Sequence, residues 1–366
     1  MLLLYLIAGL ILLVLGAEWL IRGASRLAAA LGLSPLIIGL NVVAFGTSAP
    51  ELAVSLKAGL SNQGALAAGN VIGSNLFNTL FILGLCALAT PLTVSARLVR
   101  WDVPVMIALS VAMLLLALDE RFVWWEGLLL LGSLVGYTVF QVVQGRAHPD
   151  TQETFNGEGA RAPGSLPMNA VLTLAGLGLL VLGSRLFVTG AVDLAGRLGI
   201  SEAVIGLTIV AAGTSLPEVV TSLLATIRGE RDIAVGNVLG SNTFNILGVL
   251  GVAALADPGG IDVPAAMIHF DMPVLIAVAL ACLPVFFTRG QISRQEGFCL
   301  FAYYIAYTTY LVLDVSGHDA LPAYSRAFFW FVIPLNILTW IFVAASVRNR
   351  PGGSKAGAEA AGEDPE

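Results

Sequence analysis

The chain has 366 residues, of which 57% are hydrophobic and 11% are charged, and its formal net charge is −6. A soluble domain is typically about 25% charged, and the apolar runs here are long enough to cross a bilayer. The composition therefore excludes an ordinary soluble protein and indicates an integral membrane protein. No basic stripe favours nucleic acid, and the three cysteines fit neither a disulfide framework nor a metal site.

Eleven apolar segments follow one another along the chain, each close to the roughly 20 residues that a membrane span needs. The first is expected to be a retained helix, not a cleaved signal peptide, because it has no basic leader and contains Glu18. The Gly/Ala/Glu-rich end, 348–366, is expected to be disordered. The expected spans are 2–21, 35–59, 66–89, 102–118, 122–143, 167–188, 202–227, 233–256, 270–288, 295–314 and 326–347.

Two motifs in the first half return in the second half at the same offset of 167 residues. GLNVVAFGTSAPE (39–51) returns as GLTIVAAGTSLPE (206–218), and GNVIGSNLFN (69–78) returns as GNVLGSNTFN (236–245). Around the first motif, 25 of 44 aligned positions are identical without a gap. Weaker matches continue through the fourth and fifth segments, so the duplicated unit is five helices. Paired Gly/Pro-interrupted apolar segments at matched places are typical of secondary transporters.

Because five is an odd number, the second unit must enter the membrane upside down relative to the first. With the N-terminus outside and the C-terminus in the cytoplasm, thirteen of the 18 basic residues fall on the cytoplasmic side. This asymmetry agrees with the positive-inside rule. The five basic residues left outside are Lys57, Arg121, Arg185, Arg197 and Arg326.

The predicted fold is an all-α polytopic membrane protein of two inverted five-helix repeats, ten helices in all, plus an eleventh C-terminal transmembrane helix. The expected boundaries are 1–143 for the first repeat with its ion-site motif at 39–84, 144–166 for a polar cytoplasmic linker, 167–314 for the second repeat with its motif at 206–251, 315–347 for the extra helix, and 348–366 for the tail.

The repeated motifs place one glutamate of each half, Glu51 and Glu218, inside a span. A carboxylate there is costly, and neither motif offers a matched basic partner, so a functional site is favoured over a packing role. Pro50 interrupts the helix, and the carbonyls near Ala44 are expected to lack donors and to attract an ion. The first half also offers Thr47, Ser48, Ser74 and Asn78, and the second half offers Ala211, Thr214, Ser215, Ser241 and Asn245.

Together these residues form an oxygen cage with two carboxylates and no histidine or thiolate. Hard cations such as Ca²⁺ and Na⁺ prefer such ligands. The glycines of the motifs are interpreted as packing residues. For Asn70, Asn75, Asn237 and Asn242, interhelical bonding and ion binding both stay open.

The other acids in apolar segments are weaker candidates. Glu18 aligns with Arg185 in the second half, which would allow a pair between equivalent helices, although an interfacial position is the favoured interpretation. Asp102 and Asp271 each precede a proline by two residues and are expected to begin helices, where an aspartate complements the helix dipole. Glu126 and Glu296 are interpreted in the same way.

The motifs GTSAPE with GSNLFN, and GTSLPE with GSNTFN, resemble those of the cation/Ca²⁺ exchanger superfamily, in particular its bacterial and archaeal sodium/calcium exchanger branch. The resemblance extends to about residue 314. It implies a ten-helix antiporter with Glu51 and Glu218 as central ligands of both ions. The hydroxyls and amides of the two repeated motifs would complete the sites, and the Ala44 and Ala211 carbonyls would lie at the Na⁺ positions. The first and sixth helices would slide as the gate.

The chain departs from the family pattern at two amide positions. Some family members carry Asp at one of the positions of Asn78 and Asn245, whereas both are Asn here, which makes K⁺ coupling less expected. The H⁺-coupled branch of the family typically has an Asn-Glu pairing in place of TS-x-PE, so the resemblance favours Na⁺ over H⁺ as the counter-ion. The linker is too short for the cytosolic regulatory domain of animal exchangers.

The leading hypothesis is therefore Ca²⁺/Na⁺ antiport across the cell (inner or plasma) membrane of a prokaryote. The alternatives are a Ca²⁺/H⁺ or Na⁺/H⁺ antiporter of the same fold, an ion channel, and a membrane scaffold that transports nothing. No nucleophile–base arrangement or nucleotide motif indicates an enzyme or an ATP-driven pump. We expect no cofactor, nucleic acid or protein partner, so the ions and the bilayer are the expected partners.

Overall fold

The computed structural model describes residues 2–147, 165–197, 211–287, 290–318 and 320–327. Over these ranges the chain is almost wholly helical, as its composition predicts. Seven of the described helices are long and apolar enough to cross a membrane, or eight if one bent pair counts as a single span. The tail, most of the polar linker, most of the expected eleventh helix and the first residues of the 206–218 motif lie outside the described residues.

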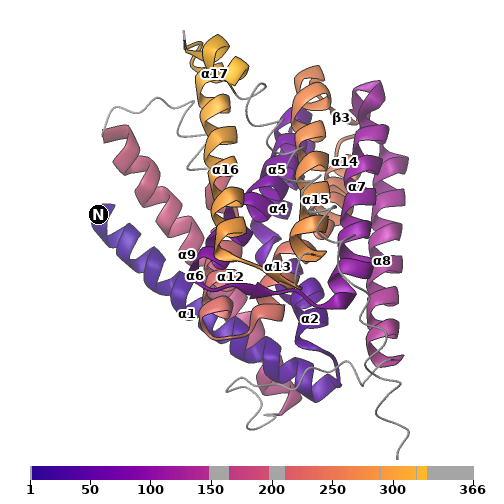
Figure 1. The fold of residues 1–366 in the computed structure, drawn as a ribbon, viewed down its shortest axis with the longest axis vertical. Coiled ribbons are helices and arrows are strands. Elements are labelled where there is room, and N and C mark those ends of the chain that lie inside the picture. Colours follow the sequence, from indigo (N-terminus) through magenta and orange to yellow (C-terminus); the bar gives the residue numbers. More distant parts are fainter. Residues whose placement is uncertain (1, 148–164, 198–210, 288–289, 319, 328–366) are drawn as a thin grey trace, which may run out of the picture. The chain divides into compact units, whose positions relative to one another are not determined.

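The first half of the chain folds into consecutive helical segments separated by short breaks and π-helical turns (Figure 1). They are α1 (Leu2–Leu31), α2 (Pro35–Ile38), η1 (Gly39–Val43), α3 (Ala44–Thr47), α4 (Ala49–Leu60), α5 (Gly64–Leu76), η2 (Phe77–Ile82), α6 (Leu83–Ala89), β1 (Leu92–Thr93), η3 (Leu98–Asp102), α7 (Val103–Leu116), η4 (Ala117–Asp119), β2 (Arg121–Phe122) and α8 (Trp124–Ala147).

The described elements of the second half follow the same order. Its described elements are α9 (Leu166–Arg197), α11 (Ala211–Thr214), α12 (Leu216–Ile227), α13 (Arg231–Phe244), η8 (Asn245–Val249), α14 (Leu250–Ala256), β3 (Ile261–Asp262), η9 (Met267–Asp271), α15 (Met272–Phe287), β4 (Gln291–Ile292) and α16 (Arg294–Val315). A separate compact unit begins at residue 319 and contains α17 (Leu321–Ala327).

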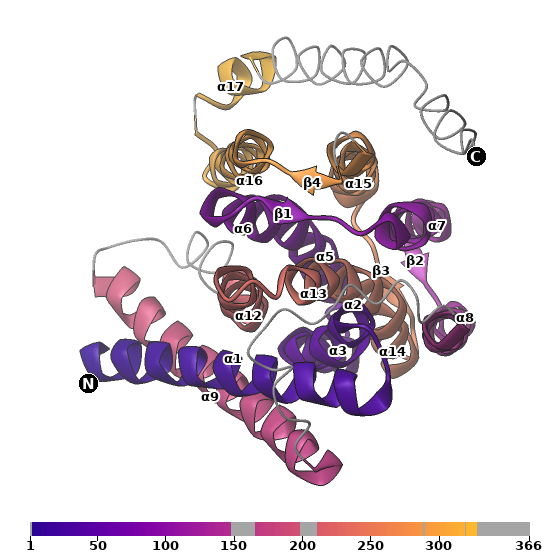
Figure 2. The same cartoon turned by 60° about the horizontal axis from the view of Figure 1, so that its bottom comes forward.

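The most buried spans carry the GSN motifs. In the most apolar window of α5 to α6, 78% of residues are buried, and in that of α13 to α14 89% are, against 33% or less in the other long spans. Figure 2 shows α5 and α13 in the middle of the bundle, with α7, α8, α15 and α16 outside them. Helices that are buried all round must satisfy their polar groups among themselves, so this position makes the polar motif residues neighbours of one another.

The two halves are joined by reciprocal strand pairs. β1 pairs antiparallel with β4, with Leu92 opposite Ile292, and β2 pairs antiparallel with β3, with Phe122 opposite Ile261. In each pair the strand after the third span of one half meets the strand before the fifth span of the other half. These short ladders satisfy backbone groups where the chain turns between spans.

The structure tests the prediction that four acidic residues begin helices. Glu126 accepts a hydrogen bond from the Val123 backbone N–H (2.9 Å), and Glu296 forms a capping box with Ser293, so both cap helix starts as predicted. The prediction for Asp102 and Asp271 is wrong by about one turn, because π turns begin at Leu98 and Met267. Their carboxylates instead accept hydrogen bonds from tyrosines of the fifth span in each half.

Glu18 on α1 forms other ion pairs than the one with Arg185 that the alignment would allow. Glu18 forms ion pairs with Arg22 on its own helix and with Arg228 at the end of α12. Among the described residues it has no ion pair with Arg185. The pair with Arg228 therefore ties the middle of α1 to the end of a helix of the second half, and the carboxylate is largely shielded there.

α1 and α9 cross each other on one side of the bundle (Figures 1 and 2). Glycines spaced seven residues apart on each helix allow the two backbones to touch. A Cβ at Gly16 would lie 2.7 Å from the Leu180 nitrogen, and one at Gly176 would lie 2.7 Å from the Gly16 oxygen. Small residues permit this close approach between membrane helices. The glycines are Gly9, Gly16 and Gly23 on α1, and Gly176, Gly183 and Gly190 on α9.

The packing interpretation of the motif glycines is confirmed in part. A Cβ at Gly39 would lie 3.0 Å from the Ile233 oxygen, and one at Gly240 would lie 2.3 Å from the Leu40 oxygen. At Gly73, in contrast, nothing lies within 4 Å of an added Cβ, so close packing does not explain this glycine.

Replacing Gly16 by Ala should loosen the crossing of α1 and α9, because the added methyl group has backbone atoms within 3 Å and no flexible neighbour to displace. Overpacking of this kind costs about 1–3 kcal/mol, so the melting temperature of the purified protein should fall by several degrees. Gly178→Ala on α9 is the matched control, because nothing lies within 4 Å of its Cβ position. Equal melting temperatures for the two variants would contradict this account of the crossing.

Candidate functional site

Both TS-x-PE motifs form a helix break. α3 ends at Thr47 and α4 begins at Ala49, with Ser48 between them at φ −80° and ψ 10°. The helical segments on either side of this break differ in direction by 47°. Ser215 occupies the equivalent break between α11 and α12, at φ −88° and ψ 9°. Each serine is followed by a proline at the second position of the next helix, which tolerates the missing N–H.

The carbonyl that loses its helical donor to the proline is that of Gly46, not the Ala44 carbonyl that was expected. Pro50 cannot donate to the carbonyl of Gly46, four residues earlier, whereas the Ala44 carbonyl accepts the Ser48 N–H at 3.0 Å. A carbonyl oxygen has two lone pairs, so the Ala44 oxygen can still bind a cation. In the second half the carbonyl opposite the proline, that of Gly213, accepts the hydroxyl of Ser184 on α9 at 2.6 Å.

The two glutamates are buried and are held crosswise between the halves. Ser48 donates to Oε1 of Glu218 at 2.8 Å, and Ser215 donates to Oε1 of Glu51 at 2.7 Å. Glu51 is 1% exposed and Glu218 is 0% exposed. Ser241 makes a longer contact with the same oxygen of Glu218, at 3.5 Å. The two breaks thus lie against each other, and the carboxylate of each half depends on the serine of the other.

Four buried oxygens in this region have no hydrogen-bond donor among the described residues. They are Oε2 of Glu51, Oε2 of Glu218, Oδ1 of Asn78 and Oδ1 of Asn245. Neither glutamate has a basic side chain within 4 Å in the described part of the chain. Buried polar atoms are normally paired, and buried charges are normally paired or coordinate a metal. The chemistry of this set, two carboxylates and two amide oxygens, is that of a hard-cation site.

The other candidates lie on helical segments that adjoin those of Glu51, Asn78 and Glu218. Thr47 is fully buried, and its hydroxyl lies 3.1 Å from Oδ1 of Asn237 and 3.4 Å from the Ala44 carbonyl. Ser74 is buried on α5, one helical turn before Asn78. Thr214 ends α11 and is half-buried, and Ala211 begins that helix. The structure therefore brings Ser48, Ser215 and Ser241 into contact with the two glutamates, and it places Thr47, Ser74 and Thr214 on the adjoining helical segments.

Asparagines for which two roles stayed open turn out to tie helices together. Asn70 donates to the Ser55 hydroxyl (2.9 Å) and to the Glu51 backbone oxygen (3.1 Å), and Asn237 donates to the Ser222 hydroxyl (3.0 Å). Each bond joins the helix that carries the glutamate to the helix that carries GSN. The recurrence of these asparagines at an offset of 167 is the signal that could have assigned this role.

Asp102 and Asp271 belong to separate polar networks. Tyr137 donates to Asp102 at 2.7 Å, and Tyr307 donates to Asp271 at 2.8 Å. In the first half Gln141 also donates to Asp102 and accepts from Asn41 at 2.8 Å. Sequence reasoning missed these tyrosines, because they lie more than 30 residues from their partners.

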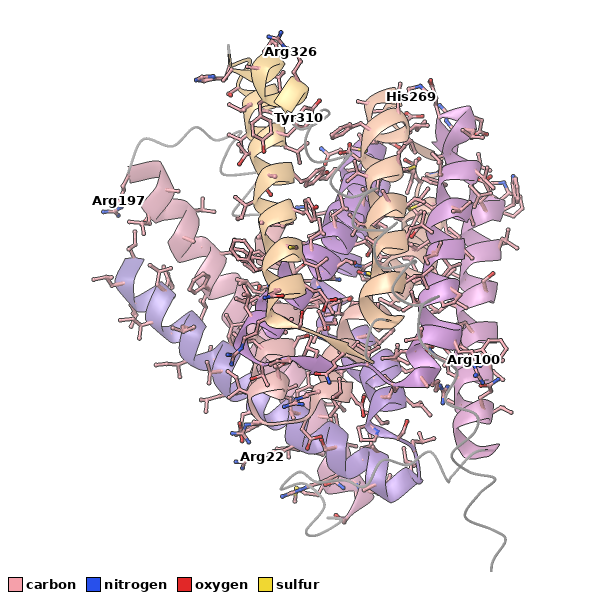
Figure 3. All side chains as sticks on the ribbon, in the orientation of Figure 1. Arg22, Arg100, Arg197, His269, Tyr310 and Arg326 are labelled. Carbon is pink, nitrogen blue, oxygen red and sulfur yellow. The ribbon has the colours of Figure 1, made fainter. Side chains whose placement is uncertain are left out.

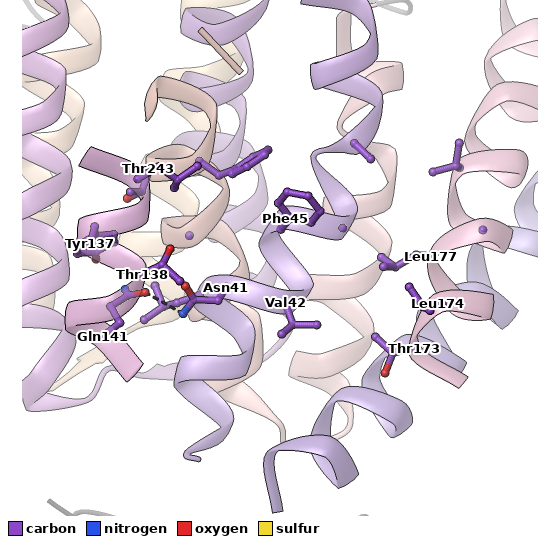
Figure 4. Close-up of a pocket in the computed structure, with 18 of the residues that line it drawn as sticks. Asn41, Val42, Phe45, Tyr137, Thr138, Gln141, Thr173, Leu174, Leu177 and Thr243 are labelled. Atoms are coloured by element: carbon purple, nitrogen blue, oxygen red, sulfur yellow. Dashed lines mark hydrogen bonds between the residues drawn. The ribbon is translucent and has the colours of Figure 1, made fainter. Parts of the chain in front are cut away.

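The Asn41–Gln141 bond lies at one side of a cavity of about 710 Å³ (Figure 4). Most of the cavity lining is apolar, with Phe45, Leu174 and Leu177 among its residues, and neither glutamate of the TS-x-PE motifs contributes to it. The cavity is therefore distinct from the buried oxygen cluster.

Comparison with known proteins identifies the class. A family model described as sodium/calcium exchanger protein matches residues 1–143 and 168–313. The chain is 39% identical over 308 residues to the putative antiporter CaxA of Alkalimonas amylolytica, covering 83% of this chain and 96% of the relative. It is 40% identical to the inner membrane protein YrbG of Escherichia coli, over 76% of this chain and 87% of that protein.

Two further relatives carry exchanger names. The sodium/calcium exchanger MaX1 of Methanosarcina acetivorans is 31% identical over 343 residues, covering 84% of this chain and 97% of that protein. A solved structure of the sodium-calcium exchanger NCX_Mj superimposes with a TM-score of 0.70 at 32% identity, covering 82% of this chain and 95% of that one. The protein is thus a multi-pass integral membrane protein of a class of ion-exchange transporters, not of enzymes. It belongs to the sodium/calcium exchanger family.

Replacing Ser48 by Ala should weaken cation binding, because the Glu218 carboxylate loses the donor that holds one of its oxygens. A hydrogen bond to a charged group is worth enough that about tenfold weaker Ca²⁺ binding is expected. Ser215→Ala should have a similar effect through Glu51. Binding is measured as ⁴⁵Ca²⁺ retention by the purified protein.

Ser110→Ala is the control for both serine variants, because Ser110 is equally buried but donates to a carbonyl of its own helix, that of Met106. Unchanged binding in both Ser48→Ala and Ser215→Ala would show that the crossed hydrogen bonds do not shape the site.

Proposed function

We propose that this protein is a secondary active antiporter that exchanges Ca²⁺ for Na⁺ across a membrane by alternating access. The observation that carries the proposal is the set of four unpaired, buried oxygens contributed by Glu51, Glu218, Asn78 and Asn245. A cation supplies the partner that these atoms lack. The exchanger names of the relatives MaX1 and NCX_Mj support Ca²⁺ and Na⁺ as the ions.

The charge of the site supports exchange of the two ions. Two carboxylates balance one Ca²⁺ or two Na⁺, and no basic side chain lies within 4 Å of either in the described residues. The charges of the two carboxylates can therefore be balanced by Ca²⁺ or by Na⁺, but not by both ions at once. This competition for the same ligands couples the Ca²⁺ flux to the Na⁺ flux. The proposed ligands are Glu51, Glu218, Thr47, Ser48, Ser74, Asn78, Thr214, Ser215, Ser241 and Asn245, with the carbonyls of Ala44 and Ala211.

The proposal includes the architecture that alternating access requires: two inverted five-helix repeats, 1–143 and 167–314, followed by an additional helix. The reciprocal serine–glutamate bonds and the reciprocal strand pairs support a two-fold relation between the halves. The glycine-lined crossing of α1 and α9 supports these helices as the sliding gate, because smooth backbone contact offers few interlocking side chains.

The proposed orientation has the N-terminus outside and the C-terminus in the cytoplasm. Arg22 and Arg100, both assigned to the cytoplasmic side by the positive-inside rule, lie in the lower half of the bundle in Figure 3. Arg197, assigned to the outside, lies in the upper half of the same view. The relative YrbG, described as an inner membrane protein, supports the cell membrane as the location.

The test is ⁴⁵Ca²⁺ uptake into proteoliposomes loaded with Na⁺ and diluted into Na⁺-free buffer, beside vesicles with only a pH gradient. We expect uptake driven by the Na⁺ gradient, and its loss in Glu51→Gln and Glu218→Gln, because each variant removes one of the two charges that balance Ca²⁺. Glu120→Gln, at an exposed glutamate between α7 and α8, should transport normally.

Uptake driven only by the pH gradient would replace Na⁺ by H⁺ as the counter-ion. Absence of uptake under both gradients, from protein that is correctly folded, would reject Ca²⁺ transport altogether.

Glu51→Gln should also change thermal stability in a way that depends on ions. In ion-free buffer the two buried carboxylates lack a counter-charge, so the neutral amide should raise the melting temperature. Ca²⁺ at about 100 times its dissociation constant should stabilise the wild type by about 2.7 kcal/mol and should leave the variant nearly unchanged. A variant that Ca²⁺ stabilises as strongly as the wild type would remove Glu51 from the site.

A further inference from the structure

In the proposed function the buried, unpaired amide oxygens of Asn78 and Asn245 bind the cation, so the groups that orient these two amides matter. An asparagine side chain presents either its oxygen or its NH₂ group to a neighbour, and the surrounding hydrogen bonds select the orientation. Only the oxygen can bind a cation. The groups that hold the NH₂ end of each amide therefore decide whether the site has this ligand at all.

Each NH₂ group is held by an asparagine of the other half. Asn78 Nδ2 donates to Oδ1 of Asn242 at 3.1 Å, and Asn245 Nδ2 donates to Oδ1 of Asn75 at 3.0 Å. In both cases the oxygen of the first residue is left buried and without a donor. Asn75 and Asn242 are about 1% exposed, so water does not compete for these bonds.

The supports behind these two asparagines differ between the halves. Asn75 Nδ2 donates to the backbone oxygen of Asn242 at 3.2 Å, so its orientation depends on the α13 backbone. Asn242 Nδ2 donates to the hydroxyl of Thr79 at 2.7 Å, and its other contact is a longer one to the sulfur of Met106 at 3.5 Å. The residue equivalent to Thr79 in the second half is Ile246, which has no hydroxyl.

We propose that Thr79 is a positioning residue that sets Ca²⁺ affinity by fixing the Asn242 amide and, through it, the oxygen of Asn78. The inference rests on the proposed function. Thr79 lies next to Asn78 along the chain, and its hydroxyl accepts from Asn242. Without that acceptor the Asn242 amide is free to turn over. It would then present NH₂ to Asn78, whose own amide must turn, and an N–H group would face the cation.

Through this chain of bonds, the orientation of the Asn78 oxygen depends on the Thr79 hydroxyl. The Asn245 oxygen has no such dependence, because a backbone carbonyl cannot turn over. Loss of the Thr79 hydroxyl should therefore remove one neutral ligand while it leaves both carboxylates and the other amide in place. The consequence is weaker Ca²⁺ binding with transport still coupled to Na⁺.

The test compares Thr79→Val with Thr79→Ser in the full-length protein. Valine has nearly the same shape but no hydroxyl, and serine keeps the hydroxyl. We expect Thr79→Val to weaken ⁴⁵Ca²⁺ binding, and to raise the Ca²⁺ concentration for half-maximal uptake, by roughly tenfold. The maximal rate should stay within about twofold, the pattern of a lost binding interaction. Thr79→Ser should restore wild-type affinity.

Thr226→Val is the matched control, because Thr226 is also buried but donates to a carbonyl of its own helix, that of Ser222. A second pair of variants tests the same chain of bonds at Asn242. Asn242→Asp keeps an acceptor for Asn78, and the Thr79 hydroxyl can rotate to donate to it, so Ca²⁺ binding should persist. Asn242→Leu has similar size without an acceptor, and its binding should fall.

The outcomes separate the two proposals. Wild-type protein that neither binds nor transports Ca²⁺ would overturn both. Suppose instead that the wild type exchanges the two ions. If Thr79→Val then binds Ca²⁺ as tightly as the wild type, or if Thr79→Ser binds Ca²⁺ as weakly as Thr79→Val, the role of Thr79 is overturned and the exchanger proposal stands. Equal binding by Asn242→Asp and Asn242→Leu would also overturn it.

Discussion

The structure depends on the placement of two buried carboxylates with no internal counter-charge. Taking an ionised carboxylate out of water costs several kcal/mol, and here two lie in the same region, each with one oxygen unpaired. Folding therefore requires the surrounding helices to provide everything except the final partner: crossed serine hydroxyls, oriented amides and broken helix ends. In the proposed function a cation is that partner, which distinguishes this region from a packed core.

Helix breaks make this placement feasible. A continuous helix through either TS-x-PE motif would use its backbone groups internally and carry its glutamate along one face. The serine–proline break bends the helix by 47° in the first half and places Ser48 at the junction, where its hydroxyl reaches the opposite half. In the second half the carbonyl released by Pro217 is satisfied by Ser184 of α9. That bond connects the helix break to α9, one of the two crossing helices, so a movement of α9 would displace the backbone at the break.

Near-symmetry in the sequence does not produce a symmetric network. The serines and glutamates exchange bonds in both directions, and so do the GSN asparagines. Their supports, however, are a threonine hydroxyl on one side and a backbone carbonyl on the other. Glu18 likewise pairs with Arg228 across the halves, although the alignment sets it opposite Arg185. In the proposed function, such differences would allow two similar halves to present unequal ligands to ions of different charge.

The sequence by itself determined much of this protein. Its long apolar runs predict membrane helices, since a bilayer offers no water to unpaired backbone groups, and the duplicated glutamates mark the site, since charge in a span is too costly to be incidental. Only the tertiary structure decided which side chains meet. Ser48 and Glu218 are 170 residues apart, and Thr79 reaches Asn242 across the interface of the halves. Hydrogen bonds act over about 3 Å, so their partners follow from helix packing and bending, which no local sequence pattern encodes.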